Sequence, residues 1–171
     1  MLFRHVPPGW AVVMSKACKA PFWHTKRLEE MTPSEWESLC DGCGRCCLHK
    51  LRDEETNELA FTNVSCRLLD TATGRCRNYE NRLREVADCS ALTPELVTAI
   101  DWLPPSCAYR LIAEGKDLPD WHPLLTGDPE STFRAGASVA RRVRSETSVH
   151  HLEDHIVNWP ARWPRARCHA G

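Results

Sequence analysis

The stretch CDGCGRCC, from Cys40 to Cys47, places four cysteines within eight residues and dominates the chemistry of this chain. Two overlapping C-x-x-C steps bring thiolates to one point through tight turns, as soft metals require. Gly42 and Gly44 provide the positive φ angles that such turns need. The doublet Cys46-Cys47 is unusual, because neighbouring side chains diverge on a helix or a strand. We therefore expect that the two doublet thiolates do not hold the same single ion.

Four more cysteines follow singly along the chain. The predicted metal ligands are then Cys40, Cys43, Cys46, Cys47, Cys66, Cys76, Cys89 and Cys107. Eight thiolates can build two four-cysteine sites, or one iron–sulfur cluster with a separate ion. Both arrangements explain the doublet, with one of its cysteines serving each centre. The nearby cations that can offset the thiolate charge are Arg45, Lys50, Arg52, Arg75 and Arg77.

The cysteine spacing does not choose between zinc and iron. Cys40, Cys43 and Cys46 match the first three positions of the bacterial ferredoxin run, but no fourth cysteine and proline follow at the required spacing. A C-x-x-C pair is equally half of a tetrahedral zinc site, which a distant pair must complete. We therefore predict Zn²⁺ or iron as the cofactor, with an Fe–S cluster among the alternatives.

Charge and hydropathy exclude several partners. The chain has 22 Lys and Arg against 23 Asp and Glu, so no global field favours nucleic acid or an anionic membrane. Its apolar stretches fall short of the roughly 18–20 residues of a membrane span. Pro7, Pro8 and Gly9 interrupt any signal-peptide core, so we read no export signal and expect a cytoplasmic protein. In a reducing compartment, clustered thiols are metal ligands rather than disulfides.

The hydrophobic content is small for the length of the chain. Leu, Ile, Val and Phe make up about one residue in five, at the lean limit for globular chains. Twelve prolines further restrict regular structure. Such a chain gains stability from metal, because buried apolar area alone leaves a small margin against chain entropy. We predict an α-rich, loop-heavy small single domain organised around a cysteine metal cluster, with room for a short β-hairpin.

The domain boundaries follow from composition. Residues 1–20 read as a flexible leader or a start-site extension, since Met14 is a natural alternative start. Residues 21–160 form the predicted cysteine-cluster metal-binding domain. Residues 161–171 read as a flexible C-terminal tail.

Local signals predict several short elements. Thr32, Pro33 and Glu35 form a capping box with proline at the first helical position, so a helix begins there and ends near Cys40. The same cap-plus-proline pattern predicts a helix over residues 93–100. Two further helices are expected over residues 78–86 and from Ser106 to Gly115.

One segment between the cysteines reads as strand and turn. Residues 59–69 are extended in pattern, and residues 70–74 have turn composition. Such a hairpin would bring Cys66 and Cys76 together.

The cysteine pattern resembles a known family. We call the eight residues from Cys40 to Cys47 the octet. The resemblance is to the CxxCxxCC cysteine-cluster family, also called YkgJ-like, and it is carried by the octet, Cys66, the segment Cys76–Arg82 and Cys89. The segments that resemble its YcgN branch are Pro21–Trp23, Glu35–Glu37, Cys107–Arg110 and Trp121–Leu124. The likeness covers about residues 21–160. It implies a bacterial cytoplasmic protein that chelates zinc or iron, without a settled activity.

Other polar residues have simpler interpretations. His49 and His122 could join a mixed site, but a hydrogen-bonded or solvated histidine is the simpler reading of each. His151 and His155 lack the glutamate of an H-E-x-x-H motif, so an exposed face is favoured. The remaining weak candidates are Cys18 and Cys168, read as incidental thiols, and Tyr79 and Arg82. The last two could donate to thiolate sulfur, with packing or surface exposure as the alternative.

Three functions remain open from the sequence. The first is a metal-binding protein whose cysteines hold zinc or iron at the centre of the fold. The second is an iron- or Fe–S-dependent redox or protein-modifying enzyme, for which the incomplete ferredoxin spacing argues. The third is a zinc-stabilised adaptor that binds another protein. Whether the chain is an enzyme is therefore left undecided.

Overall fold

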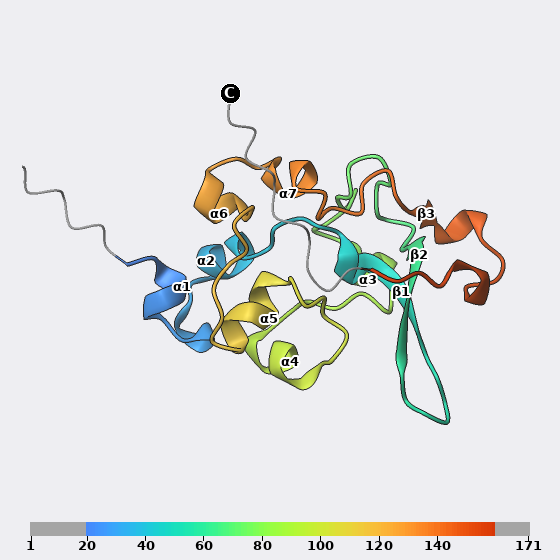
Figure 1. Ribbon diagram of the computed structural model, residues 1–171, viewed down its shortest axis with the longest axis horizontal. Coiled ribbons are helices and arrows are strands. Elements are labelled where there is room, and N and C mark those ends of the chain that lie inside the picture. Colours follow the sequence, from blue (N-terminus) through green and yellow to red (C-terminus); the bar gives the residue numbers. More distant parts are fainter. Residues whose placement is uncertain (1–19, 160–171) are drawn as a thin grey trace, which may run out of the picture.

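The computed structural model describes residues 20–159, which form short elements joined by long loops (Figure 1). The α-helices are α1 (Phe22–Thr25), α2 (Pro33–Ser38), α3 (Arg82–Glu85), α4 (Pro94–Ala99), α5 (Ala108–Ala113), α6 (Pro123–Thr126) and α7 (Ser131–Arg134). The 3-10 helices are η1 (Leu28–Glu30), η2 (Arg45–Cys47), η3 (Glu146–Ser148) and η4 (Glu153–His155). The strands are β1 (Leu48–Arg52), β2 (Leu59–Ser65) and β3 (Arg144–Ser145).

The prediction of an α-rich fold is wrong. Helical segments account for 33% of the structure, and within residues 20–159 no α-helix is longer than six residues. A three-stranded mixed sheet takes the place of the expected helical majority. Prolines begin α2, α4 and α6, and glycines in the left-handed region follow α5, α6 and α7, which end after one or two turns. The loop-heavy part of the prediction agrees with the structure.

The sheet joins segments from the two ends of the described chain. Its order is β1-β2-β3, and β1 and β2 form an antiparallel hairpin that projects from the body (Figure 1). Leu48 pairs with Ser65 and Lys50 pairs with Phe61, so the ladder shifts register at His49 through a bulge. β3 pairs in parallel with the end of β2. The C-terminal part of the chain therefore completes the sheet.

The hairpin expected between Cys66 and Cys76 is much reduced. The turn over residues 70–74 is present, with the Gly74 N–H donating to the Asp70 carbonyl at 2.7 Å. Only one bridge, Leu69 to Cys76, connects the two sides of this turn. The hairpin of the sheet lies earlier, because β1 follows the octet directly and pairs with β2.

The two capped helices are confirmed. The Thr32 hydroxyl accepts from the Glu35 N–H, and the Glu35 carboxylate accepts from the Thr32 N–H at 2.8 Å, which completes the capping box before α2. The Thr93 hydroxyl accepts from the Leu96 N–H at 3.2 Å and caps α4. Local side-chain capping fixes both starts.

The other two predicted helices are shorter than expected. The segment 78–86 contains only α3, preceded by turns. Cys107 rather than Ser106 caps α5, and Gly115 follows that helix at a φ of +67°.

The apolar interior consists of two small clusters. The larger contains Leu39, Val97, Leu103, Ala108, Tyr109 and Leu118. The smaller contains Leu48, Leu69 and Val139, with Cys47 packed against it. Cys107 packs against the larger cluster, so each of the two clusters has a cysteine at its edge.

Two sets of predictions lie outside the described residues. These predictions are the leader and tail and the incidental thiols Cys18 and Cys168, which fall in residues 1–19 and 160–171. The boundaries of the leader and the tail therefore stay predictions. Over residues 20–159, no helix has the length and apolar character to span a membrane.

Candidate metal centre

The octet begins where α2 ends and forms the tight turns that its glycines predict. Gly42 and Gly44 have φ angles of +68° and +74°. The carboxylate of Asp41 is buried and accepts a hydrogen bond from the Cys43 N–H at 3.1 Å. The chain then enters η2, which delivers the cysteine doublet to the start of β1.

The octet is packed tightly against two distant loops. A Cβ atom on Gly44 would lie 2.7 Å from the Gly74 carbonyl oxygen and 2.8 Å from a methyl carbon of Val139. The Val139 N–H also donates to the Cys43 carbonyl at 2.9 Å. Only a glycine fits at position 44, both for its φ angle and for the space available.

Six of the eight predicted ligands line one cavity of about 720 Å³. These cysteines are Cys40, Cys46, Cys47, Cys66, Cys76 and Cys89. The cavity walls also include Trp36, Trp102 and Tyr109. The structure therefore brings together thiols from segments that are far apart in sequence. All eight of the predicted ligand cysteines are free thiols.

The remaining two predicted ligands, Cys43 and Cys107, lie close to the first part of the octet. Burial raises the pKa of Cys107 to about 12, and the nearby Cys46 thiolate contributes to this rise. Burial likewise raises the pKa of Cys43, with further contributions from Asp41 and Cys46. Burial, together with Cys46 and Asp41, raises the pKa of Cys40 to about 12. Cys40, Cys43, Cys46 and Cys107 are thus electrostatic neighbours, and we name them the first set.

The other four cysteines come together through the sheet and the following turn. The Cys66 N–H donates to the Cys47 carbonyl at 2.9 Å, where β1 and β2 meet. Cys76 is bridged to Leu69, three residues after Cys66. Burial raises the pKa of Cys89, and the nearby Cys66 and Cys76 contribute to that rise. Cys47, Cys66, Cys76 and Cys89 are named the second set.

The doublet thiols converge rather than diverge. The sulfur atoms of Cys46 and Cys47 are 3.9 Å apart. Their shared proton lowers the pKa of Cys46 and raises that of Cys47. Two thiolates on one tetrahedral zinc ion are roughly 3.8 Å apart, since each Zn–S bond is about 2.3 Å. Our premise of diverging side chains is therefore wrong here, because the chain changes from a 3-10 turn to a strand between these two residues.

The donor atoms fit a thiolate site in kind and in number, but their side chains are not gathered at coordination distance. Among residues 20–159, no group of three or more Cys, His, Asp or Glu side chains is arranged to hold a metal ion. A cysteine has one rotatable side-chain bond, and a change of rotamer moves its sulfur by roughly 3 Å. Rotation of a thiol that lines the cavity can therefore bring its sulfur closer to a neighbouring thiol without moving the backbone.

Two cations accompany the thiols inside the protein. Arg45 is 4% exposed, and its guanidinium donates to the Ser106 hydroxyl at 3.3 Å. The Lys50 ammonium donates to the carbonyls of Cys46 and Leu48 at 2.9 and 2.6 Å. Both cations can offset the negative charge of thiolates.

The other predicted cations form ion pairs with carboxylates. Arg52 pairs with Asp101 at 2.7 Å, Arg75 lies 3.6 Å from Glu130 and Arg77 lies 3.9 Å from Asp70.

Several weaker candidates have contacts of their own. His122 is fully buried, with its Nε2 3.1 Å from the Leu39 carbonyl and its Nδ1 accepting from the Leu124 N–H. Both ring nitrogens are therefore used by the backbone. Tyr79 donates to Glu37, and Arg82 stacks on the Tyr79 ring. The positive charge of Arg82 also partly opposes the rise in the pKa of Cys89. His151 is exposed, as its simpler interpretation predicts.

Sequence reasoning missed one pair on the cavity wall. His49 and Glu146 both line the cavity, and the His49 Nε2 lies 2.6 Å from the Glu146 carboxylate. His49 stands two residues after the octet, and its contact with Glu146 agrees with the prediction of a hydrogen-bonded or solvated histidine. Glu146 has no sequence signal, because 97 residues separate it from its partner.

Comparison with known proteins agrees with the cysteine pattern. The family model CxxCxxCC, described as "Putative zinc- or iron-chelating domain", matches residues 39–108, a range that contains all eight predicted ligands. No solved structure matches the chain.

Full-length relatives extend the match beyond this domain. A UPF0260 protein of Granulibacter bethesdensis is 67% identical over 147 residues, which cover 86% of this chain and 89% of the relative. A UPF0260 protein of Gluconobacter oxydans is 59% identical over 88% of this chain and 94% of its own length. A UPF0260 protein of Shewanella amazonensis is 54% identical over 82% and 97%, respectively. The chain therefore belongs to the UPF0260 protein family and carries a CxxCxxCC domain at residues 39–108.

Proposed function

We propose that this protein binds zinc or iron through its eight clustered cysteines, in two sets of four. The first set is Cys40, Cys43, Cys46 and Cys107, and the second is Cys47, Cys66, Cys76 and Cys89. The observation that carries the proposal is the cavity lined by six of these thiols from separate parts of the chain. The description of the matching family model supports the choice of metals.

The fit of the residues to a metal rests on the donor chemistry. Four thiolates around one ion form the usual structural zinc site, and Fe–S clusters take the same ligand set. The doublet sulfurs are close enough to serve one ion together. We nevertheless assign one to each set, because Cys46 is an electrostatic neighbour of the other cysteines of the first set, whereas Cys47 is a neighbour of Cys66 and Cys76. The two centres would then share a wall. Such a site would supply cross-links between the two small apolar clusters, which flank the cysteines.

The test is metal analysis of the full chain after strictly anaerobic purification, combined with an absorption spectrum. We expect about two equivalents of zinc or mononuclear iron per chain, or visible absorption if a cluster is present. Folded protein with less than about a tenth of an equivalent of any transition metal would refute the proposal, because a structural site couples binding to folding.

A second candidate function is an iron- or Fe–S-dependent enzyme, and the size of the cavity favours it. A volume of about 720 Å³ exceeds what two ions occupy and falls in the range of small-molecule sites. The aromatic walls formed by Trp36, Trp102 and Tyr109 suit an organic ligand. A colourless protein that contains only zinc after anaerobic preparation would argue against this candidate.

A further inference from the structure

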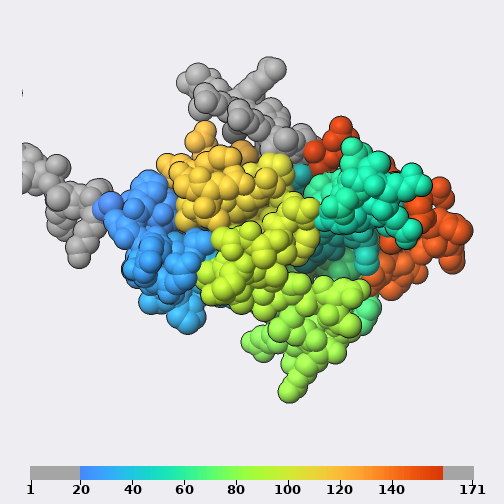
Figure 2. Space-filling model, turned by 90° about the horizontal axis from the view of Figure 1, so that it is seen from below, coloured from blue at the N-terminus to red at the C-terminus, as the bar shows by residue number. Residues whose placement is uncertain are grey.

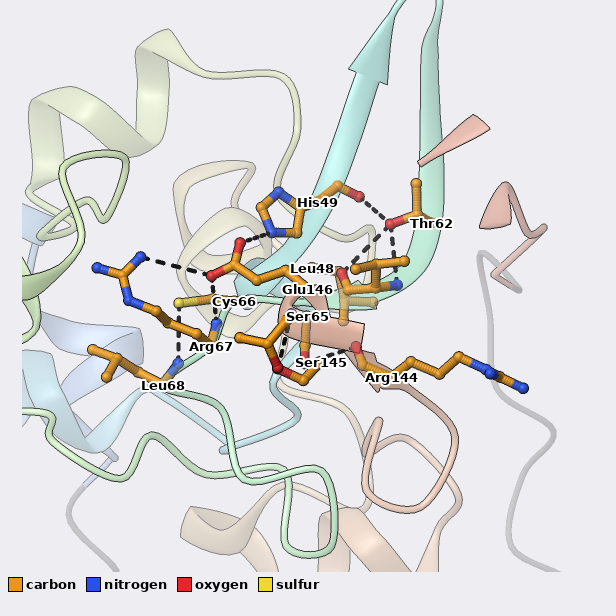
Figure 3. Close-up of polar contacts among 12 residues, drawn as sticks. Leu48, His49, Thr62, Ser65, Cys66, Arg67, Leu68, Arg144, Ser145 and Glu146 are labelled. Carbon is orange, nitrogen blue, oxygen red and sulfur yellow. Dashed lines mark hydrogen bonds and ion pairs between the residues drawn. The ribbon is translucent and has the colours of Figure 1, made fainter. Parts of the chain in front are cut away.

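The carboxylate of Glu146 joins two segments that each deliver a cysteine of the second set (Figure 3). Its Oε2 lies 2.6 Å from Nε2 of His49, two residues after Cys47. Its Oε1 accepts a hydrogen bond at 2.8 Å from the backbone N–H of Arg67, the residue after Cys66. One side chain from the C-terminal part of the chain therefore bridges the start of β1, which follows Cys47, and the segment after β2, which begins with Cys66.

The backbone around Glu146 is held independently of its carboxylate. Arg144 and Ser145 form β3, which pairs in parallel with Val64 and Ser65 of β2. The Ser65 hydroxyl also donates to the Arg144 carbonyl at 3.2 Å. In Figure 2 the red C-terminal segment lies beside the teal residues of the hairpin. Glu146 is thus presented to its partners by the sheet.

The β1–β2 ladder is irregular at His49, because three residues of β2 (62–64) lie opposite this one residue of β1. The strand register shifts between Leu48 and Lys50, and the Thr62 hydroxyl donates to the His49 carbonyl at 2.8 Å. Such irregularities increase the local twist of a strand pair and are enriched beside functional sites. The His49 imidazole lines the cysteine cavity together with Glu146.

The contacts of Arg67 extend this arrangement toward the remaining cysteines. Its guanidinium lies 3.8 Å from the Glu146 carboxylate and donates to the Glu85 carbonyl at the end of α3, shortly before Cys89. The Leu68 N–H donates to the Cys66 sulfur at 3.5 Å, within the same turn. The contacts of Glu146 thus reach the segments that hold three of the four cysteines in the second set.

We propose that residues 144–149 form a strap that positions the second cysteine set, with Glu146 as the positioning residue. The inference rests on the proposed function and adds to it a segment outside the matched range 39–108. The loss of a partner that orients a metal ligand typically weakens metal binding about 10- to 100-fold, and Glu146 acts on Cys47 and Cys66 through the residues beside them. His49 and Glu146 are 31% and 27% exposed, so their contact alone adds little to overall stability.

The first test compares Glu146→Gln with Glu153→Gln in the full chain. Glu153 is an exposed glutamate close by in sequence, with no contact to the cysteines among the described residues, and is the matched control. Metal-free protein is titrated anaerobically with Zn²⁺ against a chromophoric chelator. We expect the Glu146 variant to bind one of its two equivalents about 10- to 100-fold more weakly, with the other equivalent unchanged. Equal weakening of both equivalents would indicate a merely structural role and overturn the proposal.

Single cysteine variants assign the affected equivalent. In a Cys76→Ser background, which removes the second set, Glu146→Gln should have no further effect on the remaining equivalent. In a Cys107→Ser background, which removes the first set, it should weaken the remaining equivalent as it does in the wild type. The opposite pattern would overturn the strap.

A second measurement does not depend on metal. In metal-free protein, Glu146→Gln should accelerate alkylation of Cys66 and leave Cys107 unchanged, as mapped by peptide mass spectrometry. If the wild type binds no metal but this difference is present, the proposed function fails and the strap stands. If the wild type binds two equivalents but Glu146→Gln matches Glu153→Gln in both assays, the strap fails alone.

Discussion

Replacing Gly44 by alanine tests how closely the octet is packed against its neighbouring loops. The φ angle of +74° costs an L residue about 1–2 kcal/mol. The added methyl group would lie 2.7 Å from the Gly74 carbonyl oxygen and 2.8 Å from Val139. The oxygen belongs to the backbone and cannot rotate away, so overpacking adds about 1–3 kcal/mol. We expect Gly44→Ala to lower the free energy of unfolding by about 2–5 kcal/mol.

Gly136 is a matched control for this substitution. Its φ angle is +73°, and an added methyl group there would meet no heavy atom within 4 Å. Gly136→Ala should therefore show only the conformational cost of about 1–2 kcal/mol, while its effect on the unfolded chain is the same. Urea denaturation of both variants, in the same metal-containing buffer, measures the difference. Variants that agree within about 0.5 kcal/mol would refute the close packing of the octet.

Three further predictions follow from the same structure. Cys43→Ser should lose metal and stability together, because a structural site couples metal binding to folding. Metal analysis and thermal denaturation measure both losses, and Cys168→Ser should show neither. Equal metal content in the two variants would contradict the ligand assignment. His122 is buried with its pKa below the ordinary value of 6.5, so the unfolded chain takes up its proton first and stability should fall as the pH drops below about 6.5. Urea titrations from pH 8 to pH 5 should show a smaller decrease for His122→Asn, and an unchanged slope would count against this assignment. Thr32→Ala should lower the free energy of unfolding by about 1 kcal/mol, because the helix cap is lost. Thr98→Ala is the control and should lower it by at most about 0.5 kcal/mol, since its hydroxyl donates to a carbonyl of its own helix. Equal losses on urea denaturation would show that the cap is not stabilising.

Local signals in the sequence were sufficient for the parts of the fold that depend on neighbours along the chain. Thr32 and Thr93 each precede a proline, and both cap the helix that their pattern predicts. The turns at Gly42 and Gly44 are equally local, because the positive φ angle depends on the residue itself.

Long-range pairing accounts for what the sequence did not reveal. Residues 48–52 alternate weakly, and they become β1 only because β2 pairs with them. The convergence of Cys46 and Cys47 depends on a change from turn to strand within one residue. The candidate ligands were found from their spacing, but their division into two sets required the packing of four separate segments.

The parallel pairing of β3 with β2 has a consequence for the order of events during synthesis. All eight candidate ligands are complete when Cys107 has been made, whereas Arg144, the first residue of β3, comes 37 positions later. At about 5–20 residues per second, this interval lasts roughly 2–7 s. During that time the growing chain has its thiols but not the last strand of its sheet. Metal that enters in this interval meets a half-built sheet, and the last strand then closes over a site that is already loaded.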